Sequence, residues 1–158
     1  MPRTAQSIEA GMVYHVLNRG NCRLRLFHKE RNYDAFERVL VEGLKRYPVD
    51  LLTYCLMPNH WHLVVRPRTD VALGRLDGLG GSDARPPASR ALSPPWHRTL
   101  VPGAIQSFPV ADDDYFLTLC RYVEANPMRA KLVERAEQWR WCELWRRAHR
   151  SNDLVLSP

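Results

Sequence analysis

Two histidines stand one residue apart in the stretch MPNHWHLVV, residues 57–65. Successive side chains of a strand point to opposite faces, so His60 and His62 would project from one face while Trp61 and Leu63 point the other way. Two neighbouring imidazoles can share one divalent cation, but they supply only two ligands and do not name the metal. Taken alone, the pair is explained at least as well by two hydrogen-bonded histidines on a half-exposed strand.

A second group of candidate residues lies in RYVEANP, residues 121–127. Tyr122 and Asn126 are four residues apart near the end of a predicted helix, and therefore share one face of it. The amide oxygen of Asn126 could complete a His, His, Asn ligand set, with the phenol of Tyr122 directed at the same place. On its own this motif favours a tyrosine beside the core and an asparagine that caps a helix. The combination of the two motifs shifts the balance towards a metal site.

Local patterns predict the elements that would carry these residues. Apolar residues alternate in three short segments, and a period of about 3.6 residues recurs in two longer ones. Pro58 and Asn59 would connect two of the strands as a hairpin, and Pro127 is expected to end the second helix. We predict strands over residues 12–17, 51–57 and 60–66, and helices over residues 32–47 and 112–125.

The tail over residues 136–150 carries three tryptophans, Trp139, Trp141 and Trp145, among basic residues. This pattern fits an aromatic seal on the hydrophobic core, and it also fits a basic surface on which bases stack. We favour the core.

Composition limits the class of protein. With 158 residues, of which 45% are hydrophobic, the chain suits one domain. A net charge of +6 favours polyanions as partners, although charge alone does not separate nucleic acid from an anionic membrane. Four scattered cysteines without a C-x-x-C pair indicate reduced thiols, and we expect a cytoplasmic protein. No apolar run approaches the roughly 20 residues of a membrane span, and the first ten residues lack a signal core.

Residues 73–107 differ in character from the rest of the chain. They hold five of the 8 glycines and five of the 12 prolines, and no hydrophobic period is sustained. We expect an atypical insert here, a long loop or a disordered segment.

Three motifs occur together in one order: NRGN at residues 18–21, then HWH after MPN, then RYVEANPMRA at residues 121–130. In this combination the chain resembles the IS200-like single-tyrosine HUH transposases, specifically the REP-associated tyrosine transposase branch. The resemblance covers Val13 to about Pro67 and Phe108 to about Trp145. It implies a single α/β (α+β) domain over residues 1–158, with an antiparallel sheet of ferredoxin-like or RRM-like topology.

The resemblance also implies a site and a reaction. His60 and His62 would be the metal ligands, Asn126 the third ligand, Tyr122 the nucleophile, and Mg²⁺ or Mn²⁺ the cofactor. The implied activity is cleavage of single-stranded or hairpin DNA, including REP-like palindromes, through a 5′-phosphotyrosine that a later 3′-OH displaces in DNA transposition. We expect DNA as the partner, no membrane, and a monomer or homodimer.

Other interpretations stay open. The alternative function is a degenerate, non-catalytic nucleic-acid-binding remnant, whereas the thiol spacing disfavours a structural zinc protein. Six basic residues around the first turn and the tyrosine are candidate phosphate contacts, although an ordinary solvated charge is the alternative for any one of them. They are Arg19, Arg23, Arg25, Arg121, Arg129 and Lys131.

The resemblance has a gap. Relatives carry a helix and then a Tyr-Gln-Gly-Arg-Phe strand before Ser-Phe-Pro, whereas here TLVPGAIQ precedes Ser107–Pro109. If Leu100–Gln106 were encoded CTG GTA CCA GGG GCG ATT CAA, the frame one base later would read WYQGRF. We hypothesise that roughly residues 75–107 are translated out of frame. The chain would then lack a helix and an edge strand of its sheet, leaving the ligands in sequence but not in place.

Overall fold

The computed structural model describes residues 9–19, 24–69 and 105–149. Four strands form one sheet: β1 (Tyr14–Arg19), β2 (Val49–Met57), β3 (His60–Pro67) and β4 (Ile105–Pro109). The helices are α1 (Glu30–Arg46), α5 (Asp113–Arg129), the short 3-10 helix η3 (Ala136–Gln138) and α6 (Glu143–His149). Residues 70–104, which hold most of the compositionally unusual stretch, lie outside the described part.

The sheet is antiparallel throughout, with strand order β2-β3-β1-β4. The first and third strands are central and the second and fourth are at the edges, as in ferredoxin-like folds. The predicted fold class is therefore confirmed. Pro58 and Asn59 join β2 to β3 as the expected hairpin, in which Met57 pairs with His60.

One part of the prediction is wrong. The chain does not lack an edge strand, because Ile105–Pro109 pair with β1 along its length, Phe108 opposite His15 and Ser107 opposite Val16. The atypical stretch therefore does not extend through residue 107. Five extended residues can form a short strand when a neighbouring strand offers an edge to pair with, and β1 offers that edge to β4.

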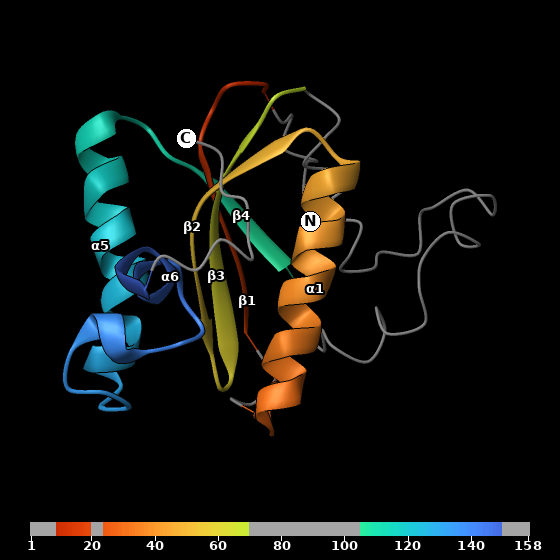
Figure 1. The fold of residues 1–158 in the computed structure, drawn as a ribbon. Coiled ribbons are helices and arrows are strands. Elements are labelled where there is room, and N and C mark those ends of the chain that lie inside the picture. The colour runs from red at the N-terminus through yellow and green to blue at the C-terminus, as the bar shows by residue number, and fades with distance from the viewer. Residues whose placement is uncertain (1–8, 20–23, 70–104, 150–158) are drawn as a thin grey trace.

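The helices cover opposite sides of the sheet, α1 on one side and α5 with α6 on the other (Figure 1). Trp61, Leu63 and Val65 point to the α1 side and join a cluster with Tyr14 and Phe36. Side chains of the opposite parity point to the α5 side, where a second cluster forms from Cys55, Met57, Val64, Leu119, Val123 and Cys142. A strand alternates its side chains, so the faces of β3 are assigned by these two clusters.

Helix α5 runs through Pro127 to Arg129, so the prediction that Pro127 would end it is wrong. A proline has no N–H for the carbonyl four residues earlier, which here belongs to Val123. The side-chain amide of Asn126 donates to that carbonyl at 3.5 Å and to the carbonyl of Tyr122 at 3.1 Å. Because this side chain replaces part of the missing bond, the last turn can form beyond the proline.

The tryptophan tail seals the core, as predicted. Trp141 is buried, and its ring stacks on Tyr33 of α1 with centroids 4.8 Å apart. The indole N–H of Trp139 donates to the carbonyl of Leu56, and the carbonyl of Trp141 accepts from the amide of Leu56, both at 2.8 Å. These bonds satisfy backbone groups at the outer edge of β2 that a free edge strand would expose. Among the described residues, no helix has the length and apolar character to cross a membrane.

Candidate active site between the sheet and α5

His60 and His62 lie on the face of β3 that looks towards α5. Both are an even number of residues from Val64 along the strand, so they point to the same face as Val64, which packs in the cluster with Leu119 and Val123 of that helix. Their ring centroids are 4.9 Å apart and the ring planes are nearly perpendicular, at 89°. The predicted projection of both imidazoles from one face is confirmed in this arrangement.

Each histidine has its Nδ1 engaged by a neighbouring side chain. His60 Nδ1 is 2.6 Å from Oδ1 of Asn59, and His62 Nδ1 is 2.9 Å from Nε2 of His15 on β1. In both rings Nε2 is the remaining nitrogen. That of His62 is buried and has no hydrogen-bond partner among the described residues. A buried polar atom without a partner is costly, and a cation at this position would satisfy it.

The histidines are neutral at neutral pH. Burial lowers the pKa of His15 and, together with the charge of Arg19, that of His60. Burial lowers the pKa of His62 to about 3, with smaller effects in the same direction from His60, His15 and Arg19. A neutral imidazole is the form that coordinates metal ions, so these residues fit a divalent cation.

The third metal ligand is less defined. Within the described ranges, no group of three or more His, Cys, Asp or Glu side chains could hold a metal ion. Asn126 is half-buried on α5, one turn after Tyr122, and its amide nitrogen is directed to the helix backbone. Its Oδ1 is the atom left for a ligand, although no hydrogen bond joins Asn126 to either histidine in the described part of the chain.

The structure brings Tyr122 to the histidines across 60 residues of sequence. Its ring centroid is 5.8 Å from that of His62, and the ring planes meet at 80°. The tyrosine is 42% exposed, so an external strand can reach it. The guanidinium carbon of Arg129 lies 5.3 Å from the centroid of the Tyr122 ring. The ring of Tyr122, the two imidazoles and the guanidinium of Arg129 therefore lie near one another.

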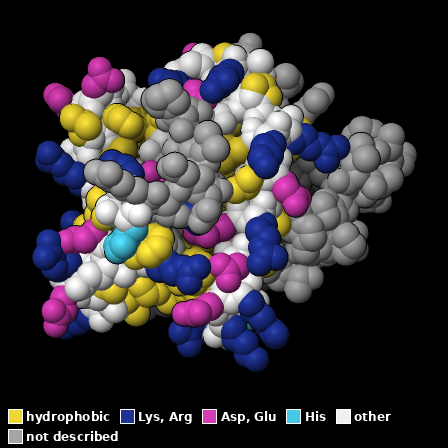
Figure 2. All heavy atoms as spheres, in the orientation of Figure 1, with side chains coloured by type: hydrophobic (Ala, Val, Ile, Leu, Met, Phe, Trp, Pro, Cys, Tyr) yellow, Lys and Arg dark blue, Asp and Glu magenta, His cyan; other side chains and the backbone are white. Residues whose placement is uncertain are grey.

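The predicted phosphate contacts divide into two groups. Arg19 pairs with His60 across the β1–β3 ladder, and Arg129 lies beside Tyr122, so both border the site. Arg121 and Lys131 are exposed at α5 and just beyond its end. Arg25 instead acts on the pKa of Tyr33 of α1, and Arg23 lies outside the described residues. On the face shown in Figure 2, Lys and Arg are interspersed with Asp and Glu, so charge does not mark one binding patch there.

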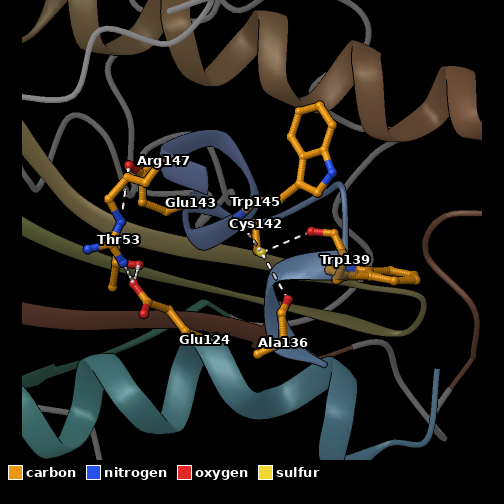
Figure 3. A network of polar contacts seen from close by, with 8 residues as sticks. All are labelled: Thr53, Glu124, Ala136, Trp139, Cys142, Glu143, Trp145 and Arg147. Atoms are coloured by element: carbon orange, nitrogen blue, oxygen red, sulfur yellow. Dashed lines mark hydrogen bonds and ion pairs between the residues drawn. The ribbon is translucent and has the colours of Figure 1, made fainter. Parts of the chain in front are cut away.

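A polar network holds α5 in place beside the site (Figure 3). Glu124 accepts a hydrogen bond from the Thr53 hydroxyl of β2 at 2.9 Å and forms an ion pair with Arg147 of α6. Because Glu124 is two residues from Tyr122, these contacts help to set where the tyrosine stands. Sequence reasoning missed Glu124, Thr53 and His15. Only the alternation of residues 12–17 indicated that His15 shares a face with other strand residues.

Comparisons with known proteins bear on the fold and on the part of the chain that carries the two histidines. Residues 9–76, which include β1, α1, β2 and β3, match the family model described as "Transposase IS200 like". The resemblance to the IS200-like transposases is confirmed. Its matched part includes His60 and His62, and ends before α5.

The structural match supports the fold of the whole chain. The solved structure is entitled "Structure of the REP associates tyrosine transposase bound to a REP hairpin". The TM-score is 0.66 at 14% sequence identity, and the match covers 100% of this chain and 88% of that one. No curated protein matches the chain.

Proposed function

We propose that this protein is a DNA strand transferase of the transposase type, which cleaves single-stranded or hairpin DNA with Tyr122 as the nucleophile. Two observations carry the proposal: the ring centroids of Tyr122 and His62 are 5.8 Å apart, and Nε2 of His62 is buried without a hydrogen-bond partner among the described residues. An exposed tyrosine beside two imidazoles with free Nε2 positions is the arrangement that metal-assisted phosphoryl transfer needs.

The chemistry assigned to Tyr122 balances without a co-reactant. The phenol oxygen bonds to the scissile phosphorus, and the bond from phosphorus to the 3′ oxygen breaks. The phenol gives up one proton and the departing 3′ oxygen gains one, leaving a free 3′-OH and a 5′-phosphotyrosine. A second 3′-OH can reverse the step on another strand, so the phosphodiester energy is conserved and no nucleotide cofactor is required.

His60, His62 and Asn126 are the residues that would hold Mg²⁺ or Mn²⁺. A bound divalent cation would polarise the scissile phosphate and neutralise the charge that develops on it. Arg19 and Arg129 border this position and suit contacts with the phosphates on either side of the cleaved bond. The partner in this proposal is hairpin-forming DNA, the kind of ligand named for the REP-associated tyrosine transposase structure that shares the fold.

A covalent trapping assay tests the proposal. The full chain is incubated with Mn²⁺ and a single-stranded DNA that carries a hairpin, and the adduct is resolved on a denaturing gel. We expect an adduct from the natural chain and none from Tyr122→Phe. Tyr115→Phe is the matched control, because Tyr115 lies on the same helix and is 52% exposed. An adduct that survives Tyr122→Phe would refute the role of this tyrosine.

A non-catalytic nucleic-acid-binding module is the second candidate function. It is favoured because no group of three or more His, Cys, Asp or Glu side chains among the described residues could hold a metal ion. Folded protein that binds the hairpin but forms no adduct with Mn²⁺ would support the module over the transferase.

A further inference from the structure

His15 contacts a proposed metal ligand without having an assigned role. It lies on β1, half-buried, on the face of the sheet that carries His60 and His62. Its Nε2 is 2.9 Å from Nδ1 of His62. The two rings are close to parallel, at 21°, with centroids 5.1 Å apart. The contact joins β1 to β3 at the point where His62 turns its other nitrogen into the site.

A hydrogen bond between two ring nitrogens needs one N–H and one lone pair, so two arrangements are possible. If His15 donates, the proton of His62 is on Nε2, which then becomes a buried donor without an acceptor. If His62 donates, its Nε2 carries a lone pair directed away from His15. Both leave Nε2 of His62 without a partner among the described residues, but only the second leaves it able to coordinate a cation.

The neighbouring histidine shows how the choice is made. Nδ1 of His60 faces the amide oxygen of Asn59 at 2.6 Å, and an amide oxygen can only accept. His60 must therefore carry its proton on Nδ1, and its Nε2 carries the lone pair. Asn59 fixes the tautomer of His60, and His15 occupies the same position relative to His62.

We propose that His15 is a positioning residue that accepts the Nδ1 proton of His62 and so presents the Nε2 lone pair of His62 to the metal. This inference rests on the proposed function, because it assumes that His60 and His62 bind the cation. Partners of this kind orient metal-bound histidines, and their loss weakens metal affinity by about 10- to 100-fold.

Two variants separate hydrogen bonding from packing. Glutamine places an amide oxygen near the position of a histidine Nε2, so His15→Gln keeps an acceptor, whereas His15→Phe keeps a ring and removes the acceptor. We expect His15→Phe to weaken Mn²⁺ binding about 10- to 100-fold, and His15→Gln to stay within about threefold of the natural chain. His28→Phe changes an exposed histidine before α1 and is the control. Mn²⁺ binding to the full chain is measured without DNA, from the electron paramagnetic resonance signal of the free ion.

A second measurement does not depend on metal affinity. Long-range ¹H–¹⁵N NMR of the metal-free natural chain reports which nitrogen of each histidine carries the proton, and a His62→Gln spectrum assigns the His62 signals. We expect a proton on Nδ1 of His62. A proton on Nε2 would overturn the inference, even if a His15 variant failed to fold.

The outcomes also separate this inference from the proposed function. If the natural chain binds Mn²⁺, His62→Gln abolishes binding, and His15→Phe binds as tightly as the natural chain, then the inference is wrong while the proposed site stands. If the natural chain binds no Mn²⁺, the metal site fails and the role of His15 fails with it. Weak binding by His15→Phe, restored by glutamine, supports the inference.

Discussion

Glu143 offers a test of how charge is buried beside the site. It is the first residue of α6 and is 4% exposed. One of its carboxylate oxygens has no hydrogen-bond partner in the part of the chain that the structure describes, and the other lies 3.8 Å from Nε of Arg147 (Figure 3). Burial raises the pKa of Glu143 from 4.5 to about 7, against the opposite effects of Arg147 and Arg146 and with a smaller increase from Glu124.

The sign and size of the effect on stability follow from this pKa. The folded state binds the Glu143 proton more tightly than the unfolded chain does. The stabilisation by protonated Glu143 is therefore complete below pH 4.5 and is lost as the pH rises through about 7. At 1.36 kcal/mol for each pH unit between these two values, the loss amounts to about 3 kcal/mol of unfolding free energy.

Replacement of Glu143 by glutamine removes this titration and keeps the shape of the side chain. We expect the unfolding free energy of Glu143→Gln, relative to that of the natural chain, to increase by about 3 kcal/mol between pH 4 and pH 8. Urea denaturation at several pH values measures this difference, and Glu134→Gln, at an exposed carboxylate, should show almost no change. If the difference in unfolding free energy between Glu143→Gln and the natural chain stays constant over the whole pH range, the reasoning is refuted.

Two further substitutions, measured by urea denaturation, test a buried ion pair and the backbone conformation after α5. Arg146→Met should lower the unfolding free energy by about 3–5 kcal/mol, because it removes the guanidinium that lies 2.6 Å from the buried carboxylate of Glu37. The control Arg135→Met, at an ion pair on the surface, should lower it by less than about 1 kcal/mol. Equal losses in the two variants would contradict the argument. Lys131→Gly should raise the unfolding free energy by about 1 kcal/mol, because Lys131 adopts φ 56° directly after α5 and glycine takes this conformation without steric cost. If the unfolding free energy does not rise, interactions of the lysine side chain offset the steric cost of its backbone conformation.

Three of the four strands and the hairpin could be predicted because their signals are local, whereas β4 was not predicted. Alternating apolar residues mark β1 and β3, and Pro58 with Asn59 marks the connection between β2 and β3. The end of α5 was not predictable in the same way. It depends on the side chain of Asn126, which bonds to the carbonyl that Pro127 leaves unpaired, and proline alone predicts only where a helix stops.

The candidate site was likewise predictable only where local sequence patterns determine it. That His60 and His62 share a face follows from the period of a strand, and that Tyr122 and Asn126 share a face follows from the period of a helix. That the two faces meet depends on the packing of Val123 and Leu119 onto the sheet, which no local pattern contains. His15 was missed for a related reason. Its contact with His62 is set by the register of β1 against β3, and register is a property of the pair of strands.

The hypothesis of a shifted reading frame can be tested against the limits of the family match. The match to the IS200-like model ends at residue 76, close to residue 75, where the shifted segment is proposed to begin. Within the proposed segment the structure describes only residues 105–107, which belong to β4, and residues 77–104 lie outside both the match and the described part, so the structure does not decide the hypothesis. The nucleotide sequence of the gene decides it. We expect the frame one base later to encode a helix followed by WYQGRF, and any other reading would refute the hypothesis.

A protein in which residues 75–107 are replaced by the translation of the frame one base later provides a physical test of the hypothesis. Its tyrosine and phenylalanine would precede Ser107, and both favour strands, so they should extend β4 beyond the five residues that now pair with β1. Amide hydrogen exchange of β1 should then slow along the edge that faces β4, at Arg19, which now has no partner on β4, as well as at the residues already paired. Because Arg19 borders His60 at this end of the sheet, a longer β4 would also support the site itself. Unchanged exchange at Arg19 would show that the present β4 already suffices to hold that end of the sheet.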